Sequence, residues 1–328
     1  MGIKSLGNRK GISYAAVWDE TGLGAMKPYE PDLPLSWCGN RGVWMGGYSI
    51  TNVIDYIAIN SLGNATDFGD LTAPRFGGGA VSNGSRACYG GGLTTGEAAS
   101  NIIDYITIAS TGNATDFGDV SAGRSAMTAC SNATRGIFAG GYQGGYINTI
   151  EYITIASTGN ATDFGDLIGT TGVQGPAGCS SKNDRGLFCG GHDANGATNI
   201  IQYITITTTG NGTDFGDLIN NIYFAAAAAS YSRAVVAGGY SVNVIQYFAT
   251  GTPGNAVDFG DLSGSRYALG ACTNGAGYGA DRAVFGGGYD GSSALNTIEY
   301  VAVSTLGNAT DFGDLTVARR YPAGCSGD

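Results

Sequence analysis

Residue types on which many enzymes and membrane proteins depend are scarce or missing in this chain of 328 residues. His192 is the only histidine, so a histidine-based metal site is not expected. No Cys-x-x-Cys pair occurs, and no run of 18 apolar residues could form a transmembrane helix. We therefore expect no metal, no cofactor and no membrane insertion.

Positive charge is also scarce. The 16 Lys and Arg residues face 26 Asp and Glu residues, which gives a net charge of −10. A nucleic-acid partner would call for a basic stripe, so none is expected. The first residues, Met1–Lys4, lack the apolar segment of a secretory signal, so we expect no signal peptide.

The most informative feature that is present is the phrase Asp-Phe-Gly-Asp, which occurs in six copies. The steps between successive copies are 49, 47, 51, 44 and 53 residues. Self-similarity at such a period predicts a repeat architecture. The six copies are Asp67–Asp70, Asp116–Asp119, Asp163–Asp166, Asp214–Asp217, Asp258–Asp261 and Asp311–Asp314.

Each repeat contains four short segments rich in Ile, Tyr, Phe and Thr, divided by Gly and Asn turns. This pattern predicts four β-strands per repeat and an all-β fold. The five consecutive alanines of Ala225–Ala229 favour a helix by local propensity. They stand where the other repeats place their first strand, so we predict a strand there.

The repeat resembles the kelch repeat of β-propellers, in which Gly-Gly follows the second strand and a Tyr lies in the third. The resemblance covers about Trp37 to the C-terminus and implies a six-bladed domain over residues 37–328. The fourth strand departs from kelch, because Asp-Phe-Gly-Asp stands where a Trp is usual. The Gly pairs are Gly46-Gly47, Gly91-Gly92, Gly140-Gly141, Gly190-Gly191, Gly238-Gly239 and Gly287-Gly288, and the tyrosines are Tyr56, Tyr105, Tyr152, Tyr203, Tyr247 and Tyr300.

Each end of the repeat region contains strands of an incomplete blade, and the two ends complement one another. The chain stops after Tyr321–Cys325, which resembles a first strand with no second strand behind it. Near the start, the segment around Val43–Met45 is a second strand with no first strand before it. We therefore predict that the C-terminal strand joins the N-terminal blade and closes the ring, which removes open sheet edges.

The repeated carboxylates suggest the acid pair of a glycosidase, but the repeat argues against that function. Residues three apart in a regular strand point to opposite faces, and an enzyme needs one site where this chain keeps six. We predict that the carboxylates satisfy turn amides or pair with the arginine that opens each second strand, and we keep bound calcium as an alternative. Those arginines are Arg41, Arg86, Arg135, Arg185, Arg233 and Arg282.

Other enzyme signals are missing too. Propellers such as galactose oxidase and the sialidases are enzymes, and the copper site of the former uses Tyr, His and Cys. This chain has one histidine and no cluster of unique polar residues. We predict no catalytic residue and no enzymatic activity.

Cysteine and Asn-x-Thr recur at fixed places of the repeat. Cys130, Cys179, Cys272 and Cys325 share one position in the first strand, which predicts small buried packing residues; disulfides or metal ligation are the alternative. Each Asn-x-Thr follows a Gly, so we predict a tight Gly-Asn turn in preference to glycosylation. Those asparagines are Asn64, Asn113, Asn160, Asn211 and Asn308.

What differs between repeats is the chain from Gly-Gly to strand three and from strand four to the next strand one. Strand alternation places both links on one face, where variable residues and planar rings gather. We predict a binding face there, and blade-joint packing is the alternative use of the same rings. The candidate binding residues are Tyr48, Tyr142, Tyr146, His192, Asp193, Tyr240, Tyr289 and Asp290.

Residues 1–36 precede the repeats and include the aromatic residues Tyr14 and Trp18, which predict a docking arm. Regular kelch-like rings with repeated Gly-Asn-Ala-Thr-Asp-Phe-Gly-Asp resemble proteins of tailed bacteriophages. The resemblance implies a non-enzymatic virion protein, assembled in the host cytoplasm, whose arm binds other virion proteins. Its loop face would bind a host-surface glycan or a protein, as in a tail fibre or appendage. A purely structural capsid or tail decoration protein and a cytosolic kelch-type interaction propeller are the alternatives.

Overall fold

The computed structural model describes residues 37–48, 51–169, 172–181, 184–275 and 281–328, and these residues contain strands but no helix. The chain divides into two units, Met1–Leu33 and Pro34–Asp328. The arm predicted at residues 1–36, with Tyr14 and Trp18, lies outside the described residues. The second unit contains the repeats.

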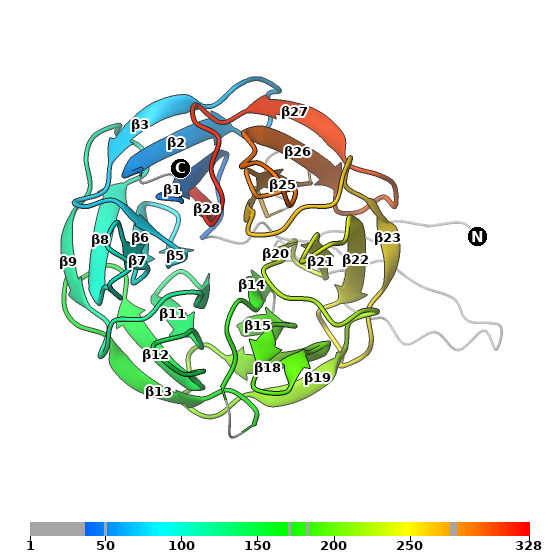
Figure 1. The fold of residues 1–328 in the computed structure, drawn as a ribbon, viewed down its shortest axis with the longest axis horizontal. Coiled ribbons are helices and arrows are strands. Elements are labelled where there is room, and N and C mark those ends of the chain that lie inside the picture. Colours follow the sequence, from blue (N-terminus) through cyan, green and yellow to red (C-terminus); the bar gives the residue numbers. More distant parts are fainter. Residues whose placement is uncertain (1–36, 49–50, 170–171, 182–183, 276–280) are drawn as a thin grey trace, which may run out of the picture. The chain divides into compact units, whose positions relative to one another are not determined.

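The repeats form a six-bladed β-propeller in which every blade is an antiparallel sheet of four strands (Figure 1). Blade 1 consists of β28 (Ala323–Gly327), β1 (Arg41–Met45), β2 (Val53–Ala58) and β3 (Thr66–Asp70). Blade 2 consists of β5 (Gly79–Ser82), β6 (Arg86–Gly90), β8 (Ile102–Thr107) and β9 (Thr115–Asp119). Blade 3 consists of β10 (Thr128–Ser131), β11 (Arg135–Ala139), β12 (Thr149–Thr154) and β13 (Thr162–Asp166).

The other three blades repeat this order from the axis outward. Blade 4 consists of β14 (Ala177–Ser181), β15 (Arg185–Cys189), β18 (Ile200–Thr205) and β19 (Thr213–Asp217). Blade 5 consists of β20 (Ala226–Ala229), β21 (Arg233–Ala237), β22 (Val244–Ala249) and β23 (Val257–Asp261). Blade 6 consists of β24 (Gly270–Thr273), β25 (Arg282–Gly286), β26 (Thr297–Ala302) and β27 (Thr310–Asp314). Two short ribbons, β4 (Arg75–Phe76) with β7 (Leu93–Thr94) and β16 (His192–Asp193) with β17 (Gly196–Ala197), lie in the links.

The predicted closure of the ring is confirmed. The last strand, β28, pairs antiparallel with β1, so that Cys325 lies opposite Val43 and Ala323 opposite Met45. In Figure 1 the red end of the chain lies inside the blue blade. The strand begins at Ala323, two residues later than predicted, because Tyr321 has a left-handed backbone with φ of 60°. The alanine run is also a strand, β20, as predicted.

The hydrophobic core is divided among the seams between blades. Six clusters of buried side chains lie there, and each joins two neighbouring blades. Trp44 of blade 1 is fully buried against blade 6, and its indole Nε1 donates to the carbonyl of Gly270 at 3.2 Å. A Cβ atom on Gly286 would lie 2.9 Å from the Trp44 ring, so the glycine of one blade makes room for the indole of the next. Both faces of each sheet are buried in this way.

The repeated phrase forms a β-bulge in the outermost strand of each blade. Ile54 of β2 lies opposite Gly69 and Asp55 opposite Asp67, which leaves Phe68 between them as the extra residue. Asp67 and Asp70 therefore lie opposite residues two apart, Asp55 and Val53, on one face of β2. The expectation that these two carboxylates point to opposite faces is wrong, because a bulge breaks the regular alternation of a strand.

A second element of the repeat connects each bulge to the next blade. The Asn of each Gly-Asn turn accepts a hydrogen bond from the backbone N–H of the last Asp in the phrase of the preceding blade. The turns therefore fasten one blade to another, a role that the turn prediction did not include. The six pairs, at 3.0 to 3.1 Å, are Asp70–Asn113, Asp119–Asn160, Asp166–Asn211, Asp217–Asn255, Asp261–Asn308 and, across the closing seam, Asp314–Asn64.

The glycine of each bulge is required by this contact. Gly313 has φ of 148°, and a Cβ atom on it would lie 2.5 Å from the carbonyl oxygen of Gly63 in blade 1. Substitution would therefore both strain the backbone and push the turn away. The amide of Gly63 also donates to the carbonyl of Phe312 at 2.9 Å, so the turn and the bulge are bonded in both directions across the seam.

We expect Gly313→Ala to lower the free energy of unfolding by about 2–4 kcal/mol, because it adds left-handed strain to a backbone clash at the closing seam. Gly264→Ala is the matched control, since no atom lies within 4 Å of a Cβ placed there. Equilibrium unfolding in denaturant measures both. Equal stability of the two variants would contradict the assigned role of the bulge.

Candidate functional site

Within the described residues, the arginines that open the second strands form no ion pair with a carboxylate, so that prediction is wrong. Each guanidinium lies over the third-strand tyrosine of its own blade, 4.3 to 4.9 Å from the ring centroid. Its Nη1 donates to a backbone carbonyl of the next blade at 2.6 to 3.0 Å. Residues Arg41, Arg86, Arg135, Arg185, Arg233 and Arg282 therefore join blades through a neutral acceptor.

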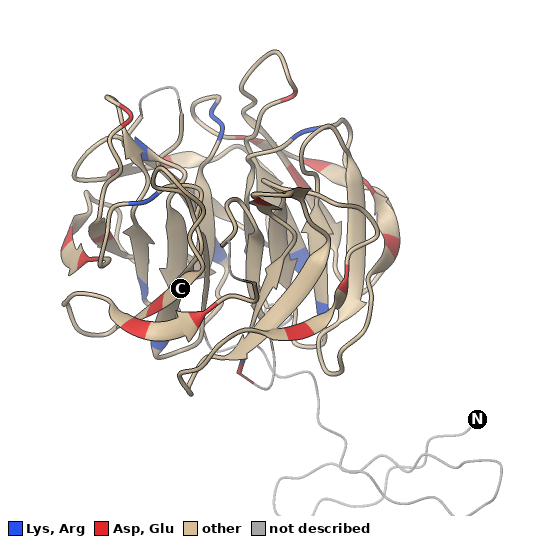
Figure 2. Ribbon diagram, turned by 60° about the horizontal axis from the view of Figure 1, so that its bottom comes forward, with Lys and Arg blue, Asp and Glu red and all other residues tan. Residues whose placement is uncertain are grey.

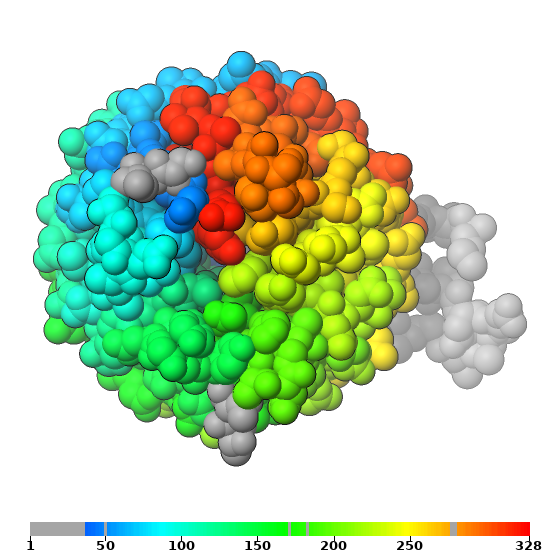
Figure 3. Space-filling model, in the orientation of Figure 1, coloured from blue at the N-terminus to red at the C-terminus, as the bar shows by residue number. Residues whose placement is uncertain are grey.

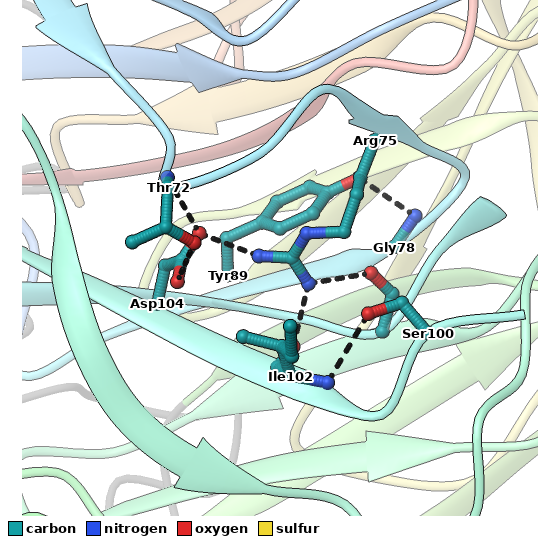
Figure 4. A network of polar contacts seen from close by, with 8 residues as sticks. Thr72, Arg75, Gly78, Tyr89, Ser100, Ile102 and Asp104 are labelled. Atoms are coloured by element: carbon teal, nitrogen blue, oxygen red, sulfur yellow. Dashed lines mark hydrogen bonds and ion pairs between the residues drawn. The ribbon is translucent and has the colours of Figure 1, made fainter. Parts of the chain in front are cut away.

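The buried carboxylates of strand three are paired with other arginines, which follow the Asp-Phe-Gly-Asp phrase. Figure 4 shows one such site, where Arg75 Nη2 lies 2.5 Å from Asp104 Oδ2 and Nη1 donates to the carbonyl of Ile102. The side chains of all four pairs are at most 3% exposed. The other pairs are Arg124–Glu151, Arg266–Glu299 and Arg319–Asp55, at 2.6, 2.5 and 2.9 Å.

Desolvation acts on the arginines of three of these pairs. Burial lowers the pKa of Arg124, Arg266 and Arg319, and the facing carboxylate opposes that shift. The carboxylates also accept a backbone N–H from the second residue after the phrase, as in Ser121 to Glu151 at 2.9 Å. Where the acid is the shorter aspartate, that residue is a threonine whose hydroxyl bonds the second oxygen, as in Thr72 to Asp104 at 2.7 Å.

The two remaining blades keep the geometry and lose the charge. In blades 4 and 5 the arginine position is occupied by Val173 and Ile222, whose carbonyls accept from the second Gly of the Gly pair as those of the arginines do. In the same two blades the acid is replaced by Gln202 and Gln246, which accept the equivalent backbone N–H at 2.7 Å. Arginine and acid are thus exchanged together, because either one left alone would be an unpaired buried charge.

We expect Glu151→Gln to lower the free energy of unfolding by about 3–5 kcal/mol, since it leaves Arg124 buried without a counter-ion. The double variant Arg124→Ile, Glu151→Gln copies the pair found in blade 5 and should regain most of that loss. Denaturant unfolding of the single and double variants measures the coupling. A double variant no more stable than the single one would contradict the pairing.

All seven cysteines are free, and they lie in or close to the seams and the axis. Cys38, Cys130, Cys179, Cys272 and Cys325 line a hollow of about 80 Å³ at one end of the axis. Burial raises the pKa of Cys38, Cys88 and Cys179 to about 12, so these thiols stay protonated. The predicted packing role of the first-strand cysteines agrees with the burial of Cys130, Cys179 and Cys272, while Cys325 is half-buried.

Because thiolates are the reactive form, we expect the folded protein to react very slowly with Ellman's reagent at pH 8. All seven thiols should react after unfolding in guanidinium chloride. Rapid native labelling of two or more thiols would contradict the burial of the first-strand cysteines.

The two variable links of each blade lie on one face, as strand alternation predicts. We call the chain from Gly-Gly to strand three the Gly-Gly link, and the chain from strand four to the next strand one the crossover link. They pair with one another in every blade, as in the bridges Tyr48–Arg320, Ser125–Tyr142 and Tyr267–Tyr289. We call this side the loop face.

Successive crossover links are also bonded to each other around the axis. The residue two positions after each buried arginine, or its apolar replacement, has φ between 52° and 68°. Its amide donates to the equivalent residue of the preceding link in five of the six links, as in Tyr321 to Ala268 at 2.6 Å. Four of these positions hold Gly or Ala. The other two hold Phe224 and Tyr321, bulky residues that rarely adopt a left-handed backbone.

The aromatic residues of the loop face form a closed circuit of contacts. Neighbouring members lie 4.2 to 6.2 Å apart, and Tyr223 and Tyr240 are stacked with an interplanar angle of 15°. One member is a cation. The aromatic circuit consists, in order, of Tyr223, Tyr240, Tyr267, Tyr289, Arg320, Tyr48, Phe76, Tyr321 and Phe224, which returns to Tyr223.

The predicted binding residues all lie on the loop face, partly or fully exposed. Tyr48, Tyr240 and Tyr289 belong to the circuit, and the first two are 37% and 51% exposed. Tyr142 is 39% exposed and contacts Tyr146. Sequence reasoning missed the crossover-link members, because nothing in one sequence shows which links pair. The residue after the buried arginine, or after its replacement, is aromatic or Arg in several repeats, which was the available signal.

The remaining candidates extend the circuit or hold turns. His192 stacks on Tyr146, accepts or donates a hydrogen bond with its hydroxyl at 3.0 Å, and reaches Tyr223 at 5.1 Å. Asp193 accepts from the amide of Asn195, and Asp290 accepts from Ser292 and Ser293. Those bonds, the one from Ser293 first, lower the pKa of Asp290.

The phrase aspartates form an acidic belt on the outer strands, which Figure 2 shows as red segments. Within the described residues no hydrogen bond or ion pair is made by their carboxylates, so the prediction that they satisfy turn amides or arginines fails. What the repeat preserves is their backbone geometry: the bulge, and the hydrogen bond from the last Asp N–H of the phrase to the Asn of the next blade's turn. No group of three or more His, Cys, Asp or Glu side chains in the described ranges is arranged to hold a metal ion.

No protein-family model matches the sequence, and no curated protein matches it. No helix in the described part of the chain is long and apolar enough to cross a membrane.

Proposed function

We propose that this protein is a non-enzymatic binding module of a tailed-phage virion, which attaches to a host surface through its loop face. The observation that carries the proposal is the aromatic circuit. Its members lie on links that vary between blades, while the strands, the bulges and the Asp–Asn hydrogen bonds between blades repeat almost unchanged. Variable loops on a rigid scaffold are where binding residues usually lie.

The exposed rings are suited to recognition. Tyr48, Tyr142 and Tyr240 present both apolar faces and phenolic hydroxyls, and aromatic anchors contribute strongly to binding surfaces. Backbone pairing between the two kinds of link holds these rings in place before a ligand arrives. A preorganised surface loses less conformational entropy on binding.

The setting on a phage particle is supported by the sequence resemblance described above. Residues 1–36, with Tyr14 and Trp18, would contact other virion proteins. A decoration protein without a host ligand would use the same scaffold, and the experiment below distinguishes the two.

We expect Tyr142→Ala, Tyr240→Ala to reduce attachment of the purified protein to host cells at least tenfold, with a loss of stability near 1 kcal/mol, because both rings are substantially exposed. The control is Leu62→Ala, Leu306→Ala, which removes apolar side chains 57% and 54% exposed on the opposite face. Flow cytometry with labelled protein measures attachment. Unchanged attachment of the tyrosine variant, or no attachment by the parent protein, would contradict a binding role of the loop face.

A further inference from the structure

Arg320 belongs to neither of the two sets of arginines that recur from blade to blade. Six of the arginines in the described ranges bond the next blade from the start of strand two, and four form the buried ion pairs. Arg320 does neither. It follows Arg319 in the crossover link that enters blade 1, and its side chain turns to the loop face instead of the seam.

The guanidinium of Arg320 contacts aromatic rings and has no counter-ion among the residues that the structure describes. It lies 4.2 Å from the centroid of Tyr48, 4.7 Å from that of Tyr289 and 5.8 Å from that of Tyr321. Its Nε is buried without a hydrogen-bond partner, and the half-buried side chain forms no ion pair with any described residue. A cation fixed in this way keeps its donors available for a ligand.

The neighbouring phenols do not neutralise it. Burial raises the pKa of Tyr267, and it raises that of Tyr321 to about 12, so both remain uncharged near neutral pH. The aromatic circuit therefore combines several neutral rings with one unpaired guanidinium. Figure 3 shows this region, where the red atoms of the last crossover link meet the blue atoms at the start of the ring.

We propose that the aromatic circuit binds a saccharide carrying a single carboxylate, with the carboxylate at Arg320 and the sugar ring on the tyrosines around it. A planar guanidinium binds a carboxylate through two parallel hydrogen bonds, and rings such as Tyr48 and Tyr240 offer flat apolar faces. This inference rests on the proposed function and names the ligand class of the same face.

Charge and shape both favour this class over other anions. The net charge of −10 repels a polyanion more strongly than it repels a ligand that carries one carboxylate. The axial hollow on this side is about 110 Å³ and is lined mainly by Gly and Ala of the inner strands, not by the circuit. The rings thus present a broad surface, which suits a sugar face better than a single acidic side chain of a peptide.

The test compares matched probes on the intact protein. Methyl β-glucuronoside carries the carboxylate, while methyl β-glucoside and the methyl ester of the glucuronoside keep the ring and lack the charge. Binding is followed by NMR titration, with the Arg side-chain N–H signals as readout. We expect the glucuronoside to bind about tenfold more tightly than either neutral probe, since a hydrogen bond to a charged group is of that strength.

Variants then assign the preference to one side chain. Arg320→Gln should abolish the preference for the glucuronoside and leave weak binding of the neutral probes. Leu306→Ala, on the opposite face, should retain the full preference. The ester comparison needs no substitution, so it stands even if Arg320→Gln disturbs the links.

The contrary results are distinct. Equal binding of all three sugars, or no binding of any, overturns the inference, while the cell-attachment assay judges the proposed function separately. If a glutamate-containing peptide binds at Arg320 more tightly than the glucuronoside, the ligand is a protein and the assignment of a saccharide is overturned. Preference that survives Arg320→Gln overturns the assigned residue.

Discussion

Every seam of the ring depends on one backbone contact, in which the Gly-Asn turn of one blade lies against the bulge of the blade before it. The contact uses an asparagine oxygen, a backbone amide and a glycine whose missing side chain leaves room for a carbonyl. None of these groups depends on the blade in which it occurs. The outer edge of each sheet is thereby covered by its neighbour, and the last seam, between blades 6 and 1, is closed by the same contact as the others. This constraint explains why every copy of the phrase keeps its glycine, whereas the carboxylates of the phrase bond to nothing among the described residues.

Although this contact is the same at every seam, the buried polar side chains differ from seam to seam. Four of them bury an arginine and an acid, and two bury an aliphatic side chain and a glutamine. The size of the acid is matched by threonine or serine two positions after the phrase. Charge is therefore conserved as a pair across two elements that are far apart in the chain but adjacent in the sheet. Buried polar groups of this kind are costly when incomplete, so they disfavour association of mismatched blades.

The sequence was sufficient for the fold because the repeat carried the same information six times. Blade number, strand order and the closing strand followed from it, and even Ala225–Ala229 was placed by register against its own propensity. The arginine pairing was not recoverable in the same way, because two arginines per repeat compete for one acid and only burial separates them. The joint exchange to Val173 with Gln202 and to Ile222 with Gln246 was the available clue. The bulge was not predicted, because side-chain alternation assumes a regular strand. The aromatic circuit was not predicted, because its members come from links that are far apart in the sequence and meet only in the folded structure.

The location of the ion pairs sets the unit in which such a ring can grow. A stretch from Thr72 to Val120 carries its own threonine, its own Arg75 and its own Asp104, so it brings a complete buried pair with it. It offers a backbone bulge to the following blade and takes one from the preceding blade, and that exchange is identical at every seam. Duplication in this frame would add a blade without creating a mismatched charge, whereas duplication of a blade from its first strand would place the second copy of Asp104 after Arg124 and not after Arg75. The stretch that keeps each arginine with its acid is therefore shifted from the structural blade by the length of a crossover link.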